Sequence, residues 1–207
     1  MIVEQYGVKY TRVTEQDIEL IRYWRNKPFI RNTMQYRGHI TAEMQKEWFK
    51  KINNKYNYYF IIEVDDKKIG LINYKDPAPN TGEAEGGIFI WDKKYWGTPI
   101  PVFASLTMLG FMYENLELND NSIVTIAKAN TRALTFNKSL GYEIYEDYKN
   151  EHFYKLILTK ERYFEKTIKL KKAAILYCKG QSEIKITATK SDILSDVLNN
   201  YLSRLNV

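Results

Sequence analysis

The sequence of 207 residues predicts an α/β fold in which one mixed β-sheet has helices on both faces. The first observation is the order of the expected elements, which is β-α-α-β-β-β-α-β-α-β-β over residues 6–159. The second is that a strand meander is followed by a β-α-β unit, so antiparallel and parallel pairs belong to one sheet. No internal repeat or low-complexity tract interrupts this order.

The N-terminal part is expected to contain one strand and two amphipathic helices. Residues 6–13 alternate as a strand does, and Thr14 followed by Asp17 is typical of a helix N-terminus. That helix ends before Pro28, because proline disfavours a helical conformation in the preceding residue. Thr41 begins the second helix. Its expected apolar stripe consists of Met44, Trp48, Phe49 and Ile52.

The middle of the chain changes from the helical period to the alternation of strands. Residues 58–64 and 68–75 form two strands joined by a turn, and residues 76–82 form a proline-containing loop. Residues 83–92 form the next strand. The pair Gly86-Gly87 inside it indicates a bulge or a close backbone approach.

The next elements are an apolar helix at 100–115, a strand at 122–128, a helix at 130–140 and strands near 142–147 and 153–159.

A C-terminal helical and strand extension follows. Residues 160–180 form either one long helix or a helix followed by a short strand, and residues 183–189 alternate as a strand. Ser191 is expected to cap a final helix with one apolar stripe.

The composition indicates a globular protein without a metal. Hydrophobic residues make up 44% and charged residues 27%, which suffices for a sizeable core. No membrane-spanning apolar run and no signal peptide pattern is present, so a cytoplasmic location is expected. One cysteine and two histidines exclude an internal disulfide and make a zinc site improbable.

The positive charge is concentrated at the C-terminal end. Residues 160–207 carry ten Lys/Arg against five Asp/Glu, of a net +6 for the chain. A solvated helix face is the favoured interpretation, and no nucleic-acid partner is expected because stacked aromatic residues are missing. The stripe of the last helix packs either on its own domain or in a homodimer.

Two motifs point to a known family. NTRALTFNKSLGYEIYE resembles the coenzyme-binding motif N-x-x-[AS]-x(6)-[LN]-G-[FY] of the GNAT acyltransferases. The matching residues are Asn130, Ala133, Leu140, Gly141 and Tyr142. GGIFIWDKKYWGTPIPVFA is similar to the preceding motif of that family, with Tyr95-Trp96-Gly97 in place. The resemblance implies a GNAT domain over residues 1–159, a basic extension over 160–207, and acetyl-CoA as the acyl donor.

The phosphate-binding loop departs from the family pattern. Pro99 and Pro101 stand where glycine and alanine are usual, and each lacks a backbone N–H. Thr98 replaces the usual basic residue or glutamine. The loop therefore offers fewer donors at the helix N-terminus that the family uses for the coenzyme's pyrophosphate.

The resemblance implies two catalytic positions. Glu85 is the candidate base, with Glu83 on the same face, although a carboxylate at a sheet edge facing solvent is an equal alternative. Asn137 occupies the position of a tyrosine acid in many relatives. Its amide is able to hydrogen-bond the sulfur but not to protonate it, so water must do so.

The same resemblance implies a set of coenzyme-binding residues. Asn130 has a compatible alternative role as a helix N-cap. The set is Ile88, Phe89, Ile90, Trp96, Gly97, Thr98, Ile100, Asn130, Arg132 and Phe136.

Residues 22–34, together with the ITAEM segment that follows, indicate the acceptor substrate through a resemblance. This segment is similar to the start of bacterial enzymes that acetylate a nucleotide-linked aminosugar in the pseudaminic acid pathway. The implied substrate-binding residues are Trp24, Arg25, Asn26, Met34 and Tyr74. A phosphate contact is also implied for Arg22, Arg25, Arg31 and Arg37, although a basic helix face is favoured for any single one.

Two other functions stay open. One is acetylation of a protein N-terminus, because the ribosomal-protein branch of the family shares the YWG motif. The other is a GNAT-fold binding module without catalysis, which Pro99, Pro101 and Asn137 favour. The main hypothesis is acetyl-CoA-dependent N-acetylation of a small-molecule amine.

Overall fold

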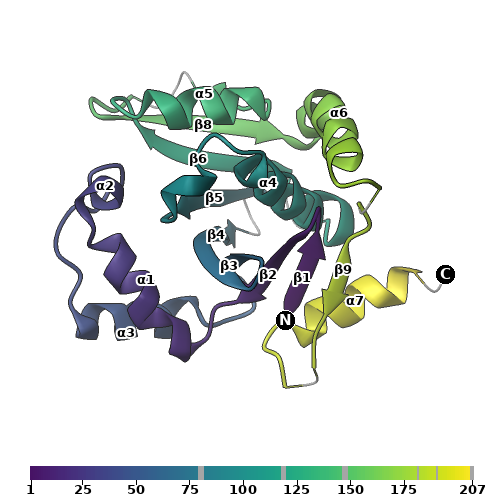
Figure 1. Cartoon of the computed structure of the whole chain (residues 1–207), viewed down its shortest axis with the longest axis horizontal. Helices are drawn as coiled ribbons and strands as arrows, with labels where there is room; N and C mark the ends of the chain where they lie inside the picture. The colour runs from purple at the N-terminus through teal and green to yellow at the C-terminus, as the bar shows by residue number, and fades with distance from the viewer. Residues whose placement is uncertain (79–81, 118–119, 146–148, 181, 190, 206–207) are drawn as a thin grey trace.

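The computed structural model describes residues 1–78, 82–117, 120–145, 149–180, 182–189 and 191–205. Its strands form one sheet in the order β7-β8-β6-β5-β4-β3-β2-β1-β9 (Figure 1). The strands are β1 (Ile2–Gln5), β2 (Val8–Arg12), β3 (Tyr58–Val64), β4 (Lys67–Ala78), β5 (Glu83–Ile90), β6 (Asn121–Ala127), β7 (Glu143–Ile144), β8 (Phe153–Thr159) and β9 (Lys185–Thr187). The β5–β6 pair is parallel and the other pairs of this sheet are antiparallel, so the predicted mixed sheet is confirmed.

Helices connect these strands. The α-helices are α1 (Ile18–Arg25), α2 (Pro28–Arg31), α3 (Ala42–Ile52), α4 (Ile100–Gly110), α5 (Thr131–Ser139), α6 (Lys160–Tyr177) and α7 (Ser195–Leu205). Shorter turns are the 3-10 helices η1 (Glu15–Asp17) and η2 (Lys93–Tyr95) and the π-helix η3 (Phe111–Asn115), which continues α4.

The buried strand β3 shows how the sheet separates two cores. Tyr58, Phe60 and Ile62 pack into the core that also holds residues of α4, α5 and α6. Tyr59 and Ile61 pack into the core that holds residues of α1 and α3. Because successive strand side chains point to opposite faces, one uninterrupted apolar run serves both cores. We call the two sides of the sheet the α4 face and the α1–α3 face.

Several predicted boundaries at the N-terminal end are wrong. The strand expected at 6–13 begins at Val8 as β2, because Tyr6 and Gly7 take positive φ values of 53° and 71° and turn the chain back onto β1, a strand that was not expected. Pro28 does end α1, but it also begins α2, where its missing N–H is harmless. The predicted N-terminus at Thr14 is confirmed, since Thr14 and Asp17 form a capping box.

Later boundaries differ as well. Strand β4 extends to Ala78 into the expected loop, of which residues 79–81 lie outside the described part. Strand β7 is limited to Glu143–Ile144, and residues 146 and 147 of its predicted range also lie outside that part. The final helix begins at Ser195 rather than after Ser191.

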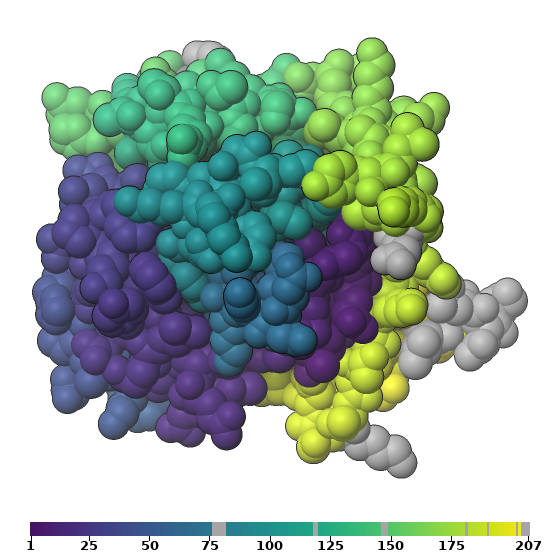
Figure 2. Space-filling view, in the orientation of Figure 1, coloured from purple at the N-terminus to yellow at the C-terminus, as the bar shows by residue number. Residues whose placement is uncertain are grey.

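The C-terminal segment packs on the sheet. Residues 160–177 form one continuous helix, with Tyr163 and Ala174 buried against the core. Strand β9 pairs with β1, and Leu194 is fully buried. Asn115 Nδ2 donates a hydrogen bond to the Tyr201 hydroxyl at 3.2 Å. The space-filling view shows this segment in yellow against the purple N-terminal strands (Figure 2).

Among the residues described, no helix is long and apolar enough to cross a bilayer. The same residues hold no group of three or more His, Cys, Asp or Glu arranged for a metal ion.

Candidate active site

Strands β5 and β6 separate in the middle of the sheet. Their parallel pairing covers only Glu83 with Asn121, Ala84 with Ser122 and Glu85 with Ile123. Beyond Glu85, strand β5 stays paired with β4 and continues to Ile90. The two strands therefore diverge, and the backbone groups of β5 that face β6 are released from the sheet ladder.

A cavity of about 550 Å³ lies at this split and is lined by residues from both faces of the sheet. On the α4 face it is lined by Gly86, Ile88, Val124, Met108, Phe136 and Tyr142. On the α1–α3 face it is lined by Arg25, Gln45, Trp48, Tyr59, Asn73, Glu85 and Phe89. Because Ile88 and Phe89 are consecutive residues of one strand on opposite sides, the cavity crosses the sheet.

The glycine pair keeps both halves of the cavity open. A Cβ on Gly87 would stand 2.8 Å from Asn73 Oδ1, so the close neighbour at this glycine is a side chain and not the backbone that was expected. A Cβ on Gly86 would instead point into the α4-face half, 3.6 Å from Ser122 Oγ and 3.8 Å from the Tyr142 hydroxyl. The β4–β5 register runs through both glycines, and its shift falls between Lys75 and Ala78, so no bulge lies at the pair.

Glu85 lies on the α1–α3 side of the split. Its Oε2 atom is 2.7 Å from Lys75 Nζ, and both side chains line the cavity. Strand β5 is an interior strand, so the alternative of an edge-strand carboxylate is wrong. Glu83 forms an ion pair with Lys155 at 3.2 Å and does not line the cavity.

Helix α5 forms one wall of the α4-face half. Asn130 caps this helix by accepting a hydrogen bond from the Ala133 N–H at 3.2 Å, which confirms its predicted N-cap role. Asn137 Nδ2 donates to the carbonyl oxygen of Ala133 at 2.9 Å. Asn130, Phe136 and Asn137 all line the cavity.

Buried hydroxyl groups lie on the same side. The Tyr142 hydroxyl and Ser122 Oγ are 2.6 Å apart, and Tyr74 is 1% exposed beside them. Burial raises the pKa of Tyr74 and of Tyr142 well above the ordinary value of 10.0, so both phenols are neutral at physiological pH. Both tyrosines line the cavity.

The loop before α4 lies outside the cavity lining. Thr98 Oγ1 donates to the Tyr95 carbonyl at 2.8 Å and accepts from the Ile100 N–H at 3.4 Å. The Phe103 N–H bonds to the Pro99 carbonyl at 3.0 Å. Since proline at 101 has no N–H, the Val102 amide is the donor that the first turn of α4 leaves for a ligand.

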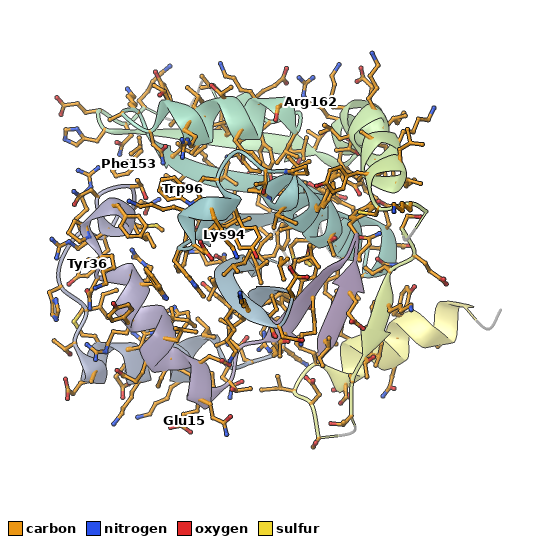
Figure 3. The ribbon with its side chains drawn as sticks, in the orientation of Figure 1. Glu15, Tyr36, Lys94, Trp96, Phe153 and Arg162 are labelled. Carbon is orange, nitrogen blue, oxygen red and sulfur yellow. The ribbon has the colours of Figure 1, made fainter. Side chains whose placement is uncertain are left out.

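Trp96, labelled in Figure 3, contacts residues of β5 and α5 from this loop. Its indole N–H donates to the Ile90 carbonyl at 2.9 Å, and the Arg132 guanidinium lies 4.9 Å from its ring centroid. Of the predicted coenzyme-binding residues, those outside the cavity lining are Ile90, Trp96, Gly97, Thr98, Ile100 and Arg132.

The predicted substrate residues separate into two groups. Arg25, Met34 and Tyr74 line the cavity. Trp24 stacks on Trp91 at a centroid distance of 6.0 Å in the core of the α1–α3 face.

Asn26 holds the loop that follows α2. Its Nδ2 donates to the Ile40 carbonyl at 2.9 Å, and the Ile40 N–H donates to its Oδ1 at 2.8 Å. Trp24 and Asn26 therefore support the wall of the cavity instead of lining it.

Gln45 is a cavity residue that the sequence analysis missed. It is 3% exposed, whereas Met44, which was expected in the buried stripe, is 42% exposed. Gln45 is three residues before Trp48 and seven before Ile52, so it shares their helix face. That spacing was the available signal, but the polarity of the residue obscured it.

A family model described as an acetyltransferase (GNAT) domain matches residues 8–143. Because this match covers more than half of the chain, the chain belongs to the GNAT acetyltransferase family and is an N-acetyltransferase.

Acetyltransferase PseH of Campylobacter jejuni subsp. jejuni serotype O:23/36 (strain 81-176) is 26% identical over 150 residues, which cover 72% of this chain and 90% of PseH. The structure of apo FdhC, a nucleotide-linked sugar GNAT, matches with a TM-score of 0.66 and 22% identity over 82% of this chain and 96% of FdhC. Spermidine N-acetyltransferase from Vibrio cholerae, solved with CoA and spermine, matches with a TM-score of 0.64 and 16% identity over 76% of this chain and 98% of that one.

Proposed function

We propose that this protein transfers the acetyl group of acetyl-CoA to the amine of a nucleotide-linked aminosugar. The observation that carries the proposal is the cavity that crosses the sheet where β5 and β6 diverge. A cavity lined from both faces of the sheet would allow a donor and an acceptor to meet from opposite sides, so that both are bound together.

The α4-face half fits the acyl donor. The backbone groups of β5 beyond Glu85 are free to pair with the amides of an extended pantetheine chain, as an added strand would. Gly86 leaves room beside them, and Phe136 supplies an apolar wall. The Val102 amide and the Arg132 guanidinium would hold the phosphates. They would compensate for the backbone N–H donor that Pro101 lacks.

Glu85 is the proposed base. Its carboxylate lies in the half of the cavity on the α1–α3 face, which we call the acceptor half. There an incoming ammonium group must lose a proton before its nitrogen attacks the thioester carbonyl. Lys75 Nζ, 2.7 Å from Glu85 Oε2, orients the carboxylate. When the new C–N bond forms and the C–S bond breaks, the nitrogen releases its second proton to solvent water and the thiolate takes a proton from that water, with the Asn137 amide beside it.

The acceptor class is supported by charge and by the relatives. The ionised residues among the described cavity lining are Arg25, Lys75 and Glu85, so the net charge of the lining is positive. This charge favours an anionic acceptor over a polyamine. The description of FdhC as a nucleotide-linked sugar GNAT and the resemblance of residues 22–34 point the same way.

The test has two parts. Calorimetry with acetyl-CoA should show binding in the micromolar range, and no binding at millimolar coenzyme would refute the proposal. Acetyl transfer is then measured on UDP- and dTDP-linked aminosugars, with spermidine as the competing acceptor. Glu85→Gln should lower kcat by about a hundredfold or more, as loss of a general base does. Glu83→Gln is the matched control, because Glu83 is two residues away and outside the cavity.

A further inference from the structure

Two buried nitrogen atoms in the acceptor half have no hydrogen-bond partner in the described part of the chain. They are Arg25 Nη1 on α1 and Gln45 Nε2 on α3. Both side chains line the cavity, and Gln45 is 3% exposed. Buried donors in native proteins are nearly always satisfied, so a pair left open on one cavity indicates that a ligand supplies the missing acceptor.

The two donors lie in the same part of the cavity, the acceptor half on the α1–α3 face, which we also call the chamber. Arg25 lies one turn after Ile21, and Gln45 lies one turn before Trp48, and all four residues line the same cavity. Helices α1 and α3 pack on each other, which brings these faces together. The Arg25 guanidinium also lies 6.0 Å from the ring centroid of Phe89, which closes the chamber toward the sheet.

The charge of the chamber selects the kind of acceptor atom. Glu85 is paired with Lys75 at 2.7 Å, so Arg25 is the cation in this lining that lacks a carboxylate partner. Desolvation lowers the pKa of Arg25, but a guanidinium stays charged throughout the physiological range. A charged donor and a neutral donor that line one cavity are complementary to an oxyanion.

We propose that Arg25 and Gln45 form a phosphate-binding subsite for the acceptor, with Gln45 as a specificity-determining residue. This inference deepens the proposed function, on which it rests for the nucleotide-linked acceptor. A phosphate ester offers several oxygens to the two donors at once, and bidentate geometry suits the guanidinium. Trp48 and the half-exposed Tyr36, labelled on the α1–α3 side in Figure 3, provide flat surfaces for the nucleoside.

The arginines that were predicted to contact a phosphate differ in their position relative to the cavity. Arg22, one turn earlier on α1, is held by Glu19 at 2.6 Å and does not line the cavity. Arg37 donates through Nε to the Met34 carbonyl at 3.2 Å and is exposed. Neither side chain is therefore placed to bind a ligand in the cavity, whereas Arg25 is.

The test measures binding of UDP and of uridine by calorimetry in the presence of saturating CoA, so that UDP does not occupy the coenzyme's own phosphate site. Gln45→Met keeps the length of the side chain and removes both donors. Gln45→Glu keeps the shape and places a carboxylate beside Arg25. Arg22→Met and Gln16→Met are the matched controls, because both residues lie outside the cavity lining.

Gln45→Met should weaken UDP binding about tenfold, and Arg25→Met should weaken it more, since the bond from a charged donor is stronger. Gln45→Glu should abolish UDP binding through repulsion. Uridine affinity should not change in any variant, and neither control should alter UDP binding. A melting curve for each variant separates loss of binding from loss of the fold.

Unchanged UDP affinity in Gln45→Met, or equal losses for UDP and uridine, would overturn the inference. The proposed function is judged separately, by acetyl transfer to nucleotide-linked aminosugars in the unmodified protein. If that transfer is absent, the proposed function fails, while the comparison of UDP with uridine still decides whether the phosphate subsite exists.

Discussion

Substitution of Gly86 by alanine should separate the stability of this protein from its ability to bind coenzyme. The added Cβ would lie 3.6 Å from Ser122 Oγ, 3.7 Å from Val124 Cγ1 and 3.8 Å from the Tyr142 hydroxyl. All three are ordinary van der Waals distances, so the folded structure accommodates the methyl group without moving. The methyl group nevertheless enters the α4-face half of the cavity, where the acyl donor is proposed to pass.

The expected magnitudes follow from these contacts. Replacing glycine where the backbone is compatible restricts the unfolded chain and stabilises the fold by about 0.5 kcal/mol. For a chain of this size the melting temperature should rise by roughly 1–2 °C. Coenzyme binding should weaken about tenfold, because an extra methyl group in a close-fitting slot typically costs about 1–3 kcal/mol.

The assay compares Gly86→Ala with Gly70→Ala by thermal unfolding and by calorimetry with acetyl-CoA. A Cβ on Gly70 would stand 2.8 Å from the Phe89 carbonyl oxygen and 3.2 Å from Ile90 Cα, which are backbone atoms that cannot yield easily. Gly70→Ala should therefore lower the melting temperature by several degrees. If Gly86→Ala also melts several degrees lower, or binds acetyl-CoA as tightly as the unmodified protein, the assignment of this half of the cavity is wrong.

Two further predictions concern stability. Burial by itself raises the pKa of Asp17, but hydrogen bonds from Lys68 at 2.7 Å and from Thr14 outweigh it, so the pKa lies below 3.8 in the folded protein. Its stabilisation is present above the unfolded pKa and is lost as the pH falls through the folded value. Asp17→Asn should cost about 1–3 kcal/mol in urea unfolding at pH 7, and a difference that persists undiminished at pH 2 would contradict this linkage. Ending the chain after Gly180 should cost about 3 kcal/mol or more, because it uncovers the surface against which Leu194 and Tyr201 pack; an unchanged urea midpoint would show that the segment contributes nothing to the core.

Local patterns in the sequence determined most of the elements. The capping box at Thr14, the N-cap at Asn130 and the uninterrupted apolar run of β3 are each decided by residues within a few positions of one another. The motif around Asn130 also indicated the family. The N-terminal hairpin was missed because Tyr6, a residue that rarely takes a positive φ, begins the turn.

Only the tertiary structure decided which side chains share the cavity. Glu85, Asn137 and Arg25 come from three distant segments, and nothing in their spacing shows that a divergence of β5 and β6 brings them around one space. The sequence likewise does not distinguish Arg25 from Arg22, since that choice depends on where Glu19 lies relative to the packed face of α1. The burial of Gln45 follows from the way α3 rests against α1 and the sheet, because helix packing and not residue polarity selects the face that turns inward.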